Sequence, residues 1–390
     1  MTTQELRQQR TDDMLKTVNR QEPTHVPVLA NPGAGIVGYA GVTLRQAMES
    51  PEAFIDAVSK LFDDLYCDAT VSCVPSATLH GQEIMGFAQF RIGPDDTTIE
   101  HVQMNYMKPE EYDQLIADPT GYVKNVLLPR KYPFIFKDDI ETVKEKLKAA
   151  TDEYGYTFGY IGGSLTGVLE EKYGLADYQD NTLAVYPGAP AIDILFDTLR
   201  GFKGTMLDLR RNYEDVKRAC QVLWDERVAP LYENPIPFSY PFGMQVPHIP
   251  AYLNPKQFGE LYWPQEKMIL EKMAEAGNKM TIILEGKWSH VLDYLLDAPK
   301  DSMILMVDDD DILEVNRRVG HHQIVAGGAK LADLMTKSKE ECIDSVKRVF
   351  DECAPGGGFI FTTDKIWNSP TDVCPNLFEV YHFAHEYGKY

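Results

Sequence analysis

The second half of the chain alternates short apolar runs with segments of helical spacing, and this alternation constrains the fold most. The runs predict strands at 280–285, 302–307, 322–327 and 357–362. The remaining segments predict helices at 263–276, 287–297, 310–318, 338–353 and 376–387. Such alternation is typical of βαβ units, whose strands lie parallel in one sheet.

The first half shows weaker signals of the same kind. Strands are predicted at 26–30, 68–74 and 157–161, and a proline-rich loop at 235–244 leads into another short strand. Helices are predicted at 1–20, 44–65, 109–128, 138–151, 188–201 and 213–230, with an antiparallel hairpin at 88–102. About eight strands favour an α/β fold of the closed (β/α)8 TIM barrel type. We expect one domain over 1–390, with 1–25 as an N-terminal helical extension. An open doubly wound sheet is the alternative.

Composition excludes several classes of function. The chain has a net charge of -21 and no cluster of Lys and Arg. Proteins that bind nucleic acids or anionic membranes need such clusters, so both classes are disfavoured. No apolar run approaches the roughly 20 residues of a membrane span, and the polar N-terminus does not resemble a signal peptide. The six cysteines are scattered without a Cys-x-x-Cys pair, so we expect free thiols and a cytoplasmic protein. No Gly-x-Gly-x-x-Gly follows the first strand, which disfavours dinucleotide binding.

Acidic residues end several of the predicted strands. Glu285, Asp308 and Asp364 each follow an apolar run, and His248 follows the proline-rich loop. The carboxyl ends of barrel strands meet at one rim, so these four residues are the predicted catalytic groups. A carboxylate paired with a neighbouring charge, a loop cap, or a histidine bonded to a backbone carbonyl is the alternative role for each.

Aromatic residues lie near the same strand ends. Trp288, Trp367, Tyr240 and Phe242 are predicted to stack on a substrate ring, although packing at the barrel mouth explains aromatics equally well. His80 ends the loop after the second strand and is predicted to join the substrate site.

Several local motifs occur in a recognisable order along residues 20–388. They are Tyr160–Thr166, Leu199–Phe202, Ile282–Gly286, Val325–Asp333 and Gly356–Pro370. The ordered set resembles the uroporphyrinogen decarboxylase superfamily, which implies a distorted (β/α)8 barrel. True decarboxylases carry arginines in an N-terminal motif that binds the substrate carboxylates. The corresponding residues 28–35 contain no arginine, which disfavours that activity.

The other branch of the superfamily comprises cobalamin-dependent methyltransferases. Members that act on coenzyme M bind zinc through a His-x-Cys motif, whose positions here are Ile283 and Glu285. The chain resembles more closely the methyltransferase I components of O-demethylases, which implies an aromatic methyl ether substrate and a corrinoid protein as partner. A zinc motif Glu-x14-Glu-x20-His is associated with that group. Glu285 and His321 keep its outer spacing, whereas Lys300 occupies the middle position.

The sequence therefore predicts a corrinoid-dependent methyltransferase that demethylates an aromatic methyl ether. Zinc bound by Glu285 and His321 is a further expectation, and a homodimer is left open. Transfer from a non-aromatic donor, or from the corrinoid protein to an acceptor, is the first alternative. A decarboxylase, or a non-catalytic barrel that binds a corrinoid or tetrapyrrole, is the second.

Overall fold

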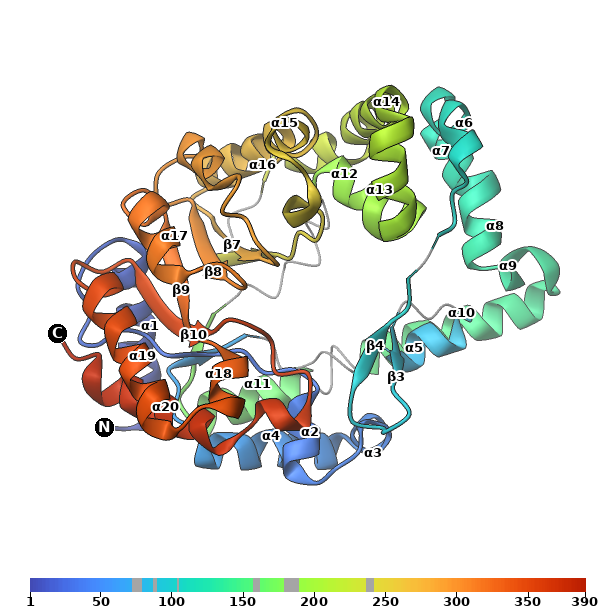
Figure 1. The fold of residues 1–390 in the computed structure, drawn as a ribbon. Helices are drawn as coiled ribbons and strands as arrows, with labels where there is room; N and C mark the ends of the chain where they lie inside the picture. Colours follow the sequence, from blue (N-terminus) through green and yellow to red (C-terminus); the bar gives the residue numbers. More distant parts are fainter. Residues whose placement is uncertain (72–78, 87–89, 104, 157–161, 179–188, 236–241) are drawn as a thin grey trace.

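A computed structural model describes residues 1–390 except 72–78, 87–89, 104, 157–161, 179–188 and 236–241. Parallel strands form two ladders, with neighbours in the orders β5-β2-β1 and β10-β9-β8-β7-β6. A parallel bridge between Val28 and Phe361 joins the two ladders at β1 and β10. The strands are β1 Leu29–Ala30, β2 Ala69–Thr70, β5 Ala176–Asp177, β6 Phe242–Gln245, β7 Lys279–Leu284, β8 Met303–Val307, β9 Ile324–Ala329 and β10 Phe359–Thr363. Figure 1 shows β7 to β10 side by side.

The α/β class with a parallel sheet agrees with the sequence, but a closed barrel is not formed by the described strands. Within the residues that the structure describes, no ladder joins β5 to β6. The sheet is nevertheless curved, because side chains from both ladders share one buried cluster that includes Leu29, Ala69, Ile304 and Ile360. The alternate side chains of β7 and β8 pack into the second, larger cluster. Because both faces of the sheet are buried, the sequences of these strands are unbroken apolar runs.

Helices cover the outer face of the sheet. The longer ones are α1 Thr3–Val18, α4 Pro51–Asp64, α10 Ile140–Gly155, α11 Gly162–Glu171, α13 Gly201–Arg211, α14 Tyr213–Leu223, α16 Trp263–Glu275, α17 Ile312–Val319, α19 Lys339–Cys353 and α20 Pro375–Tyr387. The shorter ones are α2 Gly35–Ala40, α3 Leu44–Glu49, α5 Leu79–Ile84, α6 Tyr112–Ala117, α7 Pro119–Tyr122, α8 Leu128–Lys131, α9 Phe134–Lys137, α12 Ala191–Ile194, α15 Pro255–Gln257 and α18 Leu331–Thr336. Among the described residues, none of the helices has the length and apolar character needed to cross a membrane.

Several predicted elements are confirmed and others are corrected. The predicted hairpin is present as β3 Phe90–Ile92 and β4 Ile99–His101. Strands are expected at 26–30 and 68–74, but the observed β1 and β2 have only two residues each. The strand expected at 157–161 lies outside the described residues. The helix expected at 287–297 is only a 3-10 helix, η10 Leu292–Asp297, since Asp310 accepts the Trp288 N–H and holds that segment as a turn.

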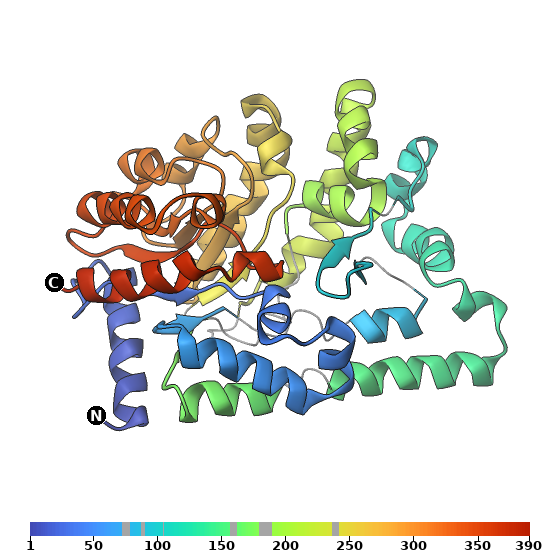
Figure 2. The ribbon, with the colours of Figure 1, turned by 60° about the horizontal axis from the view of Figure 1, so that its bottom comes forward.

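Helix α1 closes the amino-terminal end of the curved sheet. Its Met14 and Val18 are fully buried in the cluster inside the curve. Beside them, Asp68 accepts hydrogen bonds from Val28 N and the Tyr66 hydroxyl at 2.8 and 2.6 Å. Asp68 also pairs with His25 and Arg10 at 3.0 and 3.2 Å. This buried charged network holds α1 to β1 and β2, and Figure 2 shows α1 standing at the edge of the molecule near the C-terminal α20.

Helices α6 to α10 form an arc at one side of the molecule (Figure 1). The Tyr112 hydroxyl on α6 donates to Asp208 of α13 at 2.8 Å. The buried Arg200 guanidinium donates to the same carboxylate at 2.5 Å and to the Met107 carbonyl. Residues 107–112 are thereby fixed to α13, next to the segment that carries Asp193 and Asp197.

Candidate functional site

Three predicted catalytic residues meet at the carboxyl ends of adjacent strands. His248 follows β6, Glu285 follows β7 and Asp308 follows β8, and these strands are consecutive in the sheet. The backbone register pairs Leu284 of β7 with Val307 of β8, which sets Glu285 and Asp308 level at the sheet edge. The prediction that these strand-end residues lie close together is confirmed, and their catalytic role stays a prediction.

An imidazole between two carboxylates forms the centre of the cluster. His248 Nδ1 lies 3.0 Å from Asp197 Oδ2, and His248 Nε2 lies 3.4 Å from Glu285 Oε2. Asp197 comes from η5 Leu195–Arg200, the helical segment that continues α12. The side chains of His248 and Glu285 remain 42% and 48% exposed, so both are accessible to a ligand.

The two carboxylates favour the protonated imidazole. The hydrogen bond to Asp197, and then the charges of Asp197, Glu285 and Asp193, outweigh partial burial and raise the pKa of His248 to about 9. Partial burial, together with the charges of Asp308 and Asp197, raises the pKa of Glu285, and His248 and Lys365 act against this shift. At neutral pH the centre therefore holds an imidazolium that has a proton to give.

The buried carboxylate of Asp193 fixes the backbone of His248. Asp193 Oδ1 accepts the backbone N–H groups of His248 and Ile249 at 3.1 and 3.0 Å. Asp193 is only 2% exposed, and burial first, then the nearby Asp197 charge, raises its pKa to about 7. Asp193 and Asp197 are one helical turn apart, so one short helix orients both the main chain and the ring of His248.

A glycine turn sets the position of Glu285. Gly286 has φ 75, a conformation that glycine adopts without strain, and its N–H donates to Asp308 Oδ2 at 2.9 Å. A Cβ at Gly286 would lie 2.9 Å from the Ala251 Cβ. The absence of a side chain thus lets the turn after β7 approach the loop that carries His248.

A lysine and the fourth predicted acid extend the cluster toward β10. Lys365 Nζ lies 2.6 Å from Asp308 Oδ1 and 3.0 Å from Asp309 Oδ1. The buried Asp364 accepts the Leu331 N–H at 2.9 Å, and its pKa is raised, mainly by burial. Asp364 therefore caps the start of α18, while Asp308 is neutralised by Lys365. Neither is as free to act on a ligand as Glu285 or His248.

Near Asp193 lies a buried carboxyl group, that of Glu266, which the sequence did not predict. Glu266 of α16 is 2% exposed, and neither carboxylate oxygen has a hydrogen-bond partner within the described residues. The same holds for the Tyr262 hydroxyl and Asp193 Oδ2. Burial, and secondarily the Asp193 charge, raises the pKa of Glu266 to about 8. Both buried acids are thus able to hold a proton near neutral pH.

Two of the four aromatic residues predicted to stack on a substrate ring, Trp288 and Trp367, are buried in the core. Trp288 is 1% exposed and packs edge-on against Phe258 and Tyr262, with its indole N–H on the Glu285 carbonyl. Trp367 is fully buried, and its indole N–H donates to the Thr363 hydroxyl. Both predictions are wrong because the rings pack in the core and expose no face.

His80 lies outside the centre, while the predicted roles of Tyr240 and Phe242 stay predictions. His80 lies on α5 and pairs with Glu153 of α10 at 3.3 Å, a salt bridge outside the strand-end cluster. Tyr240 lies outside the described residues, and Phe242 is described only as the first residue of β6.

The predicted zinc pair is corrected by the topology. Glu285 follows the carboxyl end of β7, whereas His321 lies in the turn before the amino end of β9, a parallel strand of the same sheet. The two side chains lie at opposite edges of the sheet and cannot share one ion. Across the described ranges, no set of three His, Cys, Asp or Glu side chains is arranged to hold a metal ion.

Sequence reasoning missed Asp193, Asp197 and Lys365. The 188–201 segment was expected to be helical, and two aspartates four residues apart on it were a usable signal. Their partner His248 is over 50 residues away, so only the fold reveals the contact. Lys365 directly follows Asp364, and its pairing with Asp308 depends on the proximity of the two strand ends in the fold.

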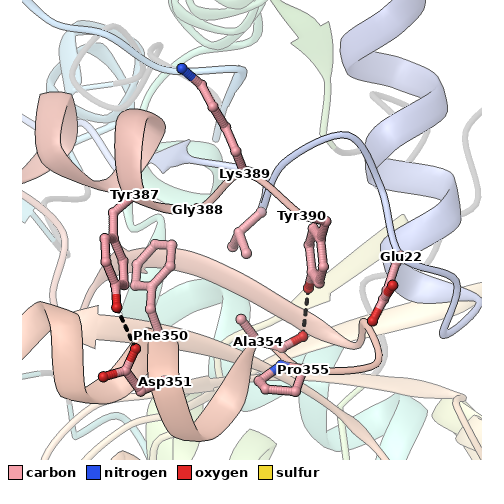
Figure 3. Close-up of a pocket in the computed structure, with 10 residues that line it drawn as sticks. Glu22, Phe350, Asp351, Ala354, Pro355, Tyr387, Gly388, Lys389 and Tyr390 are labelled. Carbon is pink, nitrogen blue, oxygen red and sulfur yellow. Dashed lines mark hydrogen bonds between the residues drawn. The ribbon is translucent and has the colours of Figure 1, made fainter.

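A separate hollow of about 520 Å³ lies near the C-terminal residues (Figure 3). The Tyr387 and Tyr390 hydroxyls point to Asp351 and to the Ala354 carbonyl, to which they donate. Glu22 at its edge accepts the Gly356 N–H. The polar groups that line the hollow are thus largely engaged with one another, and none belongs to the strand-end cluster.

Comparison with known families gives one match. A model described as uroporphyrinogen decarboxylase (URO-D) matches residues 248–364, slightly under a third of the chain. The match supports the uroporphyrinogen decarboxylase superfamily, whose members include enzymes. It begins at His248 and ends at Asp364, so it includes the four residues predicted at the strand ends, whereas Asp193, Asp197 and Lys365 lie outside it. A search of curated proteins gives no match.

Proposed function

We propose that the protein is a corrinoid-dependent methyltransferase that demethylates an aromatic methyl ether. The observation that supports this most is the exposed imidazole of His248, held between the Asp197 and Glu285 carboxylates at the sheet edge. Cleavage of an aryl ether needs an acid for the leaving oxygen. A proton donor suits an oxygen leaving group, which takes up a proton as it departs. Activation of a thiol acceptor instead needs a metal ion that binds the thiolate.

The proposed reaction balances as a methyl transfer with one proton. The C–O bond breaks, and its electron pair stays on the phenolic oxygen. The methyl carbon accepts an electron pair from the Co(I) of the corrinoid protein, which acts as the methyl acceptor. His248 Nε2 gives its proton to the oxygen, and the products are a phenol and the methylated corrinoid protein.

The remaining residues prepare His248 for this step. Asp197 raises its pKa, and Asp193 holds its backbone, so the acid stays charged and in place. Glu285 orients Nε2 in the resting state and is exposed enough to take a proton from water and restore the imidazolium. General acids of this kind typically contribute about 10²–10⁴-fold in rate.

Zinc does not fit the residues of this centre. Both ring nitrogens of His248 already pair with carboxylates, at 3.0 Å from Asp197 and 3.4 Å from Glu285, and within the described residues no three His, Cys, Asp or Glu side chains are arranged to hold a metal ion. The Asp308 carboxylate is already neutralised by Lys365. The proposed chemistry is therefore acid catalysis by the protein, with no step that depends on zinc.

The test is incubation of the protein with a reduced corrinoid protein and a panel of methoxyarenes. We expect methyl–cobalt absorbance with at least one donor. His248→Gln should lower the rate at least about 100-fold, because the acid is lost. His382→Gln, an exposed histidine on α20, is the matched control and should retain the rate. No methyl–cobalt signal with any donor would refute the proposal.

A further inference from the structure

A cationic side chain shared by two carboxylates occurs twice at the carboxyl edge of the sheet. In the first group, the protonated ring of His248 lies 3.0 Å from Asp197 Oδ2 and 3.4 Å from Glu285 Oε2. The Glu285 side chain is 48% exposed, so its charge is open to a ligand that approaches His248. One positive charge faces two negative charges, and this group therefore carries a net negative charge.

The second group is centred on Lys365. Its Nζ lies 2.6 Å from Asp308 Oδ1 and 3.0 Å from Asp309 Oδ1. Asp308 also accepts the Gly286 N–H at 2.9 Å, which joins this group to the turn directly after Glu285. The Asp309 side chain is 49% exposed. The second group thus has the same excess of one negative charge, and it adjoins the first.

The excess remains when every charged residue at this edge is included. The three residues that follow each of β6 to β10 include five acidic and four basic side chains, and Asp197 is a sixth acid beside them. The basic residues are His248, Lys287, Lys330 and Lys365, and the acids at the strand ends are Glu285, Asp308, Asp309, Asp310 and Asp364. The sequence outside the described ranges contains no lysine or arginine, and its one charged residue is Asp180. Those ranges therefore supply no compensating cation.

A net negative edge distinguishes ligands by their charge. For a ligand charge about 8 Å from a carboxylate, with an effective dielectric constant of about 40–80, one such pair changes a binding constant roughly two- to six-fold. Two excess carboxylates therefore weaken an anionic ligand roughly five- to thirty-fold relative to a neutral ligand of the same shape. A cationic ligand gains by a similar factor.

We propose that the methyl donor is an aryl methyl ether without an anionic substituent, and that Glu285 and Asp309 disfavour donors that carry a carboxylate. This inference rests on the proposed function, and it adds the charge of the substrate. Glu285 and Asp309 determine the specificity because they are the most exposed carboxylates of the two groups. A positively charged substituent on the ring is favoured by the same edge.

Three probes of one shape test the charge preference without methyl transfer. They are 4-methoxybenzoate, 4-methoxybenzamide and 4-methoxybenzamidine, which are anionic, neutral and cationic at neutral pH. Titration calorimetry at low salt, without any corrinoid protein, should give the tightest binding for the cationic probe and the weakest for the anionic probe. The neutral and anionic probes should differ roughly five- to thirty-fold. Salt at about 1 M should reduce the difference, because screening acts on charge and not on shape.

Substitutions with opposite expected effects locate the preference at this edge. Glu285→Gln and Asp309→Asn should each strengthen binding of the anionic probe roughly two- to six-fold relative to the neutral probe. Lys365→Gln should weaken it by a similar factor, because it removes a positive charge from the same edge. Glu340→Gln, at an exposed position of α19, is the matched control and should leave the ratio unchanged. Thermal unfolding of each variant verifies that the fold is intact.

The outcomes separate the two proposals. Equal or tighter binding of the anionic probe overturns the charge preference, and so does a ratio that none of the three variants changes, since the preference would then arise elsewhere. Absence of binding by all three probes overturns it as well, because an aryl ether would not be the ligand. The expected order of affinities, without methyl transfer to any corrinoid protein, supports the charge preference and refutes the methyltransferase.

Discussion

Replacement of Glu266 by Gln should stabilise the protein at alkaline pH. Glu266 is an acid with no hydrogen-bond partner on either oxygen among the described residues, and it lies 2% exposed in the core. Ionisation of such a group is costly, because nothing replaces the water that solvates a carboxylate. Burial accordingly raises its pKa from 4.5 to about 8.

The sign follows from proton linkage. In the unfolded chain Glu266 ionises near pH 4.5, whereas in the folded protein it keeps its proton up to about pH 8. The folded state therefore binds more protons in this window, and the free energy of unfolding falls as pH rises. Between pH 5 and pH 8 we expect Glu266 alone to lower the free energy of unfolding by on the order of 3 kcal/mol. A neutral glutamine does not titrate, so Glu266→Gln should remove most of this loss.

Urea unfolding at pH 5, 6.5 and 8 measures the effect. The free energy of unfolding of the wild type should drop more steeply with pH than that of Glu266→Gln. Glu271→Gln, at an exposed position of the same helix, is the matched control and should follow the wild type. Equal pH dependence of Glu266→Gln and wild type would refute the reasoning and show that Glu266 is ionised, with a partner, in the folded protein.

Substitutions at four other positions test the site and the structure that supports it. Asp197→Asn removes the main cause of the raised pKa of His248, so the alkaline loss of methyl transfer should move from about pH 9 toward 6.5, as a pH–rate profile would show. Gly286→Ala forces a left-handed residue against Ala251 and should cost about 1–2 kcal/mol from the backbone alone, with a lower rate of methyl transfer. Trp288→Ala should lower the free energy of unfolding by about 3–5 kcal/mol, whereas Trp288→Phe should leave the KM for the ether unchanged, which steady-state kinetics would check. Asp68→Asn leaves Arg10 without its buried counter-charge and His25 with Asp13 alone, 3.7 Å away, and should destabilise by about 3–5 kcal/mol in urea unfolding.

The regular half of the fold was predictable from the sequence because its strands are buried on both faces. Met303–Val307 and Phe359–Thr363 are apolar or small throughout and appear where the pattern placed them. The first half gave weaker predictions, since β1 and β2 have only two paired residues each. Strands so short carry no periodicity, and tertiary contacts decide their ends.

The site was predictable in part. The strand-end rule brought Glu285, Asp308 and His248 together correctly, because parallel strands share one carboxyl edge. The same rule says nothing about which groups surround an acid. Asp197 reaches His248 across 51 residues of sequence, and Trp288 turned into the core instead of toward the edge. Partner and orientation depend on packing, which one sequence does not reveal.

The backbone around Glu285 is held by groups other than Glu285 itself. The Gly286 N–H donates a hydrogen bond to Asp308, the Trp288 N–H donates to Asp310, and the His248 N–H donates to Asp193. The backbone conformation at position 285 therefore does not depend on the side chain that this residue carries. Exchange of Glu285 for a thiol should leave the main chain in place and change only the chemistry offered at this edge. In evolutionary terms, such a backbone would let one sheet edge change between a carboxylate and a thiolate through single substitutions.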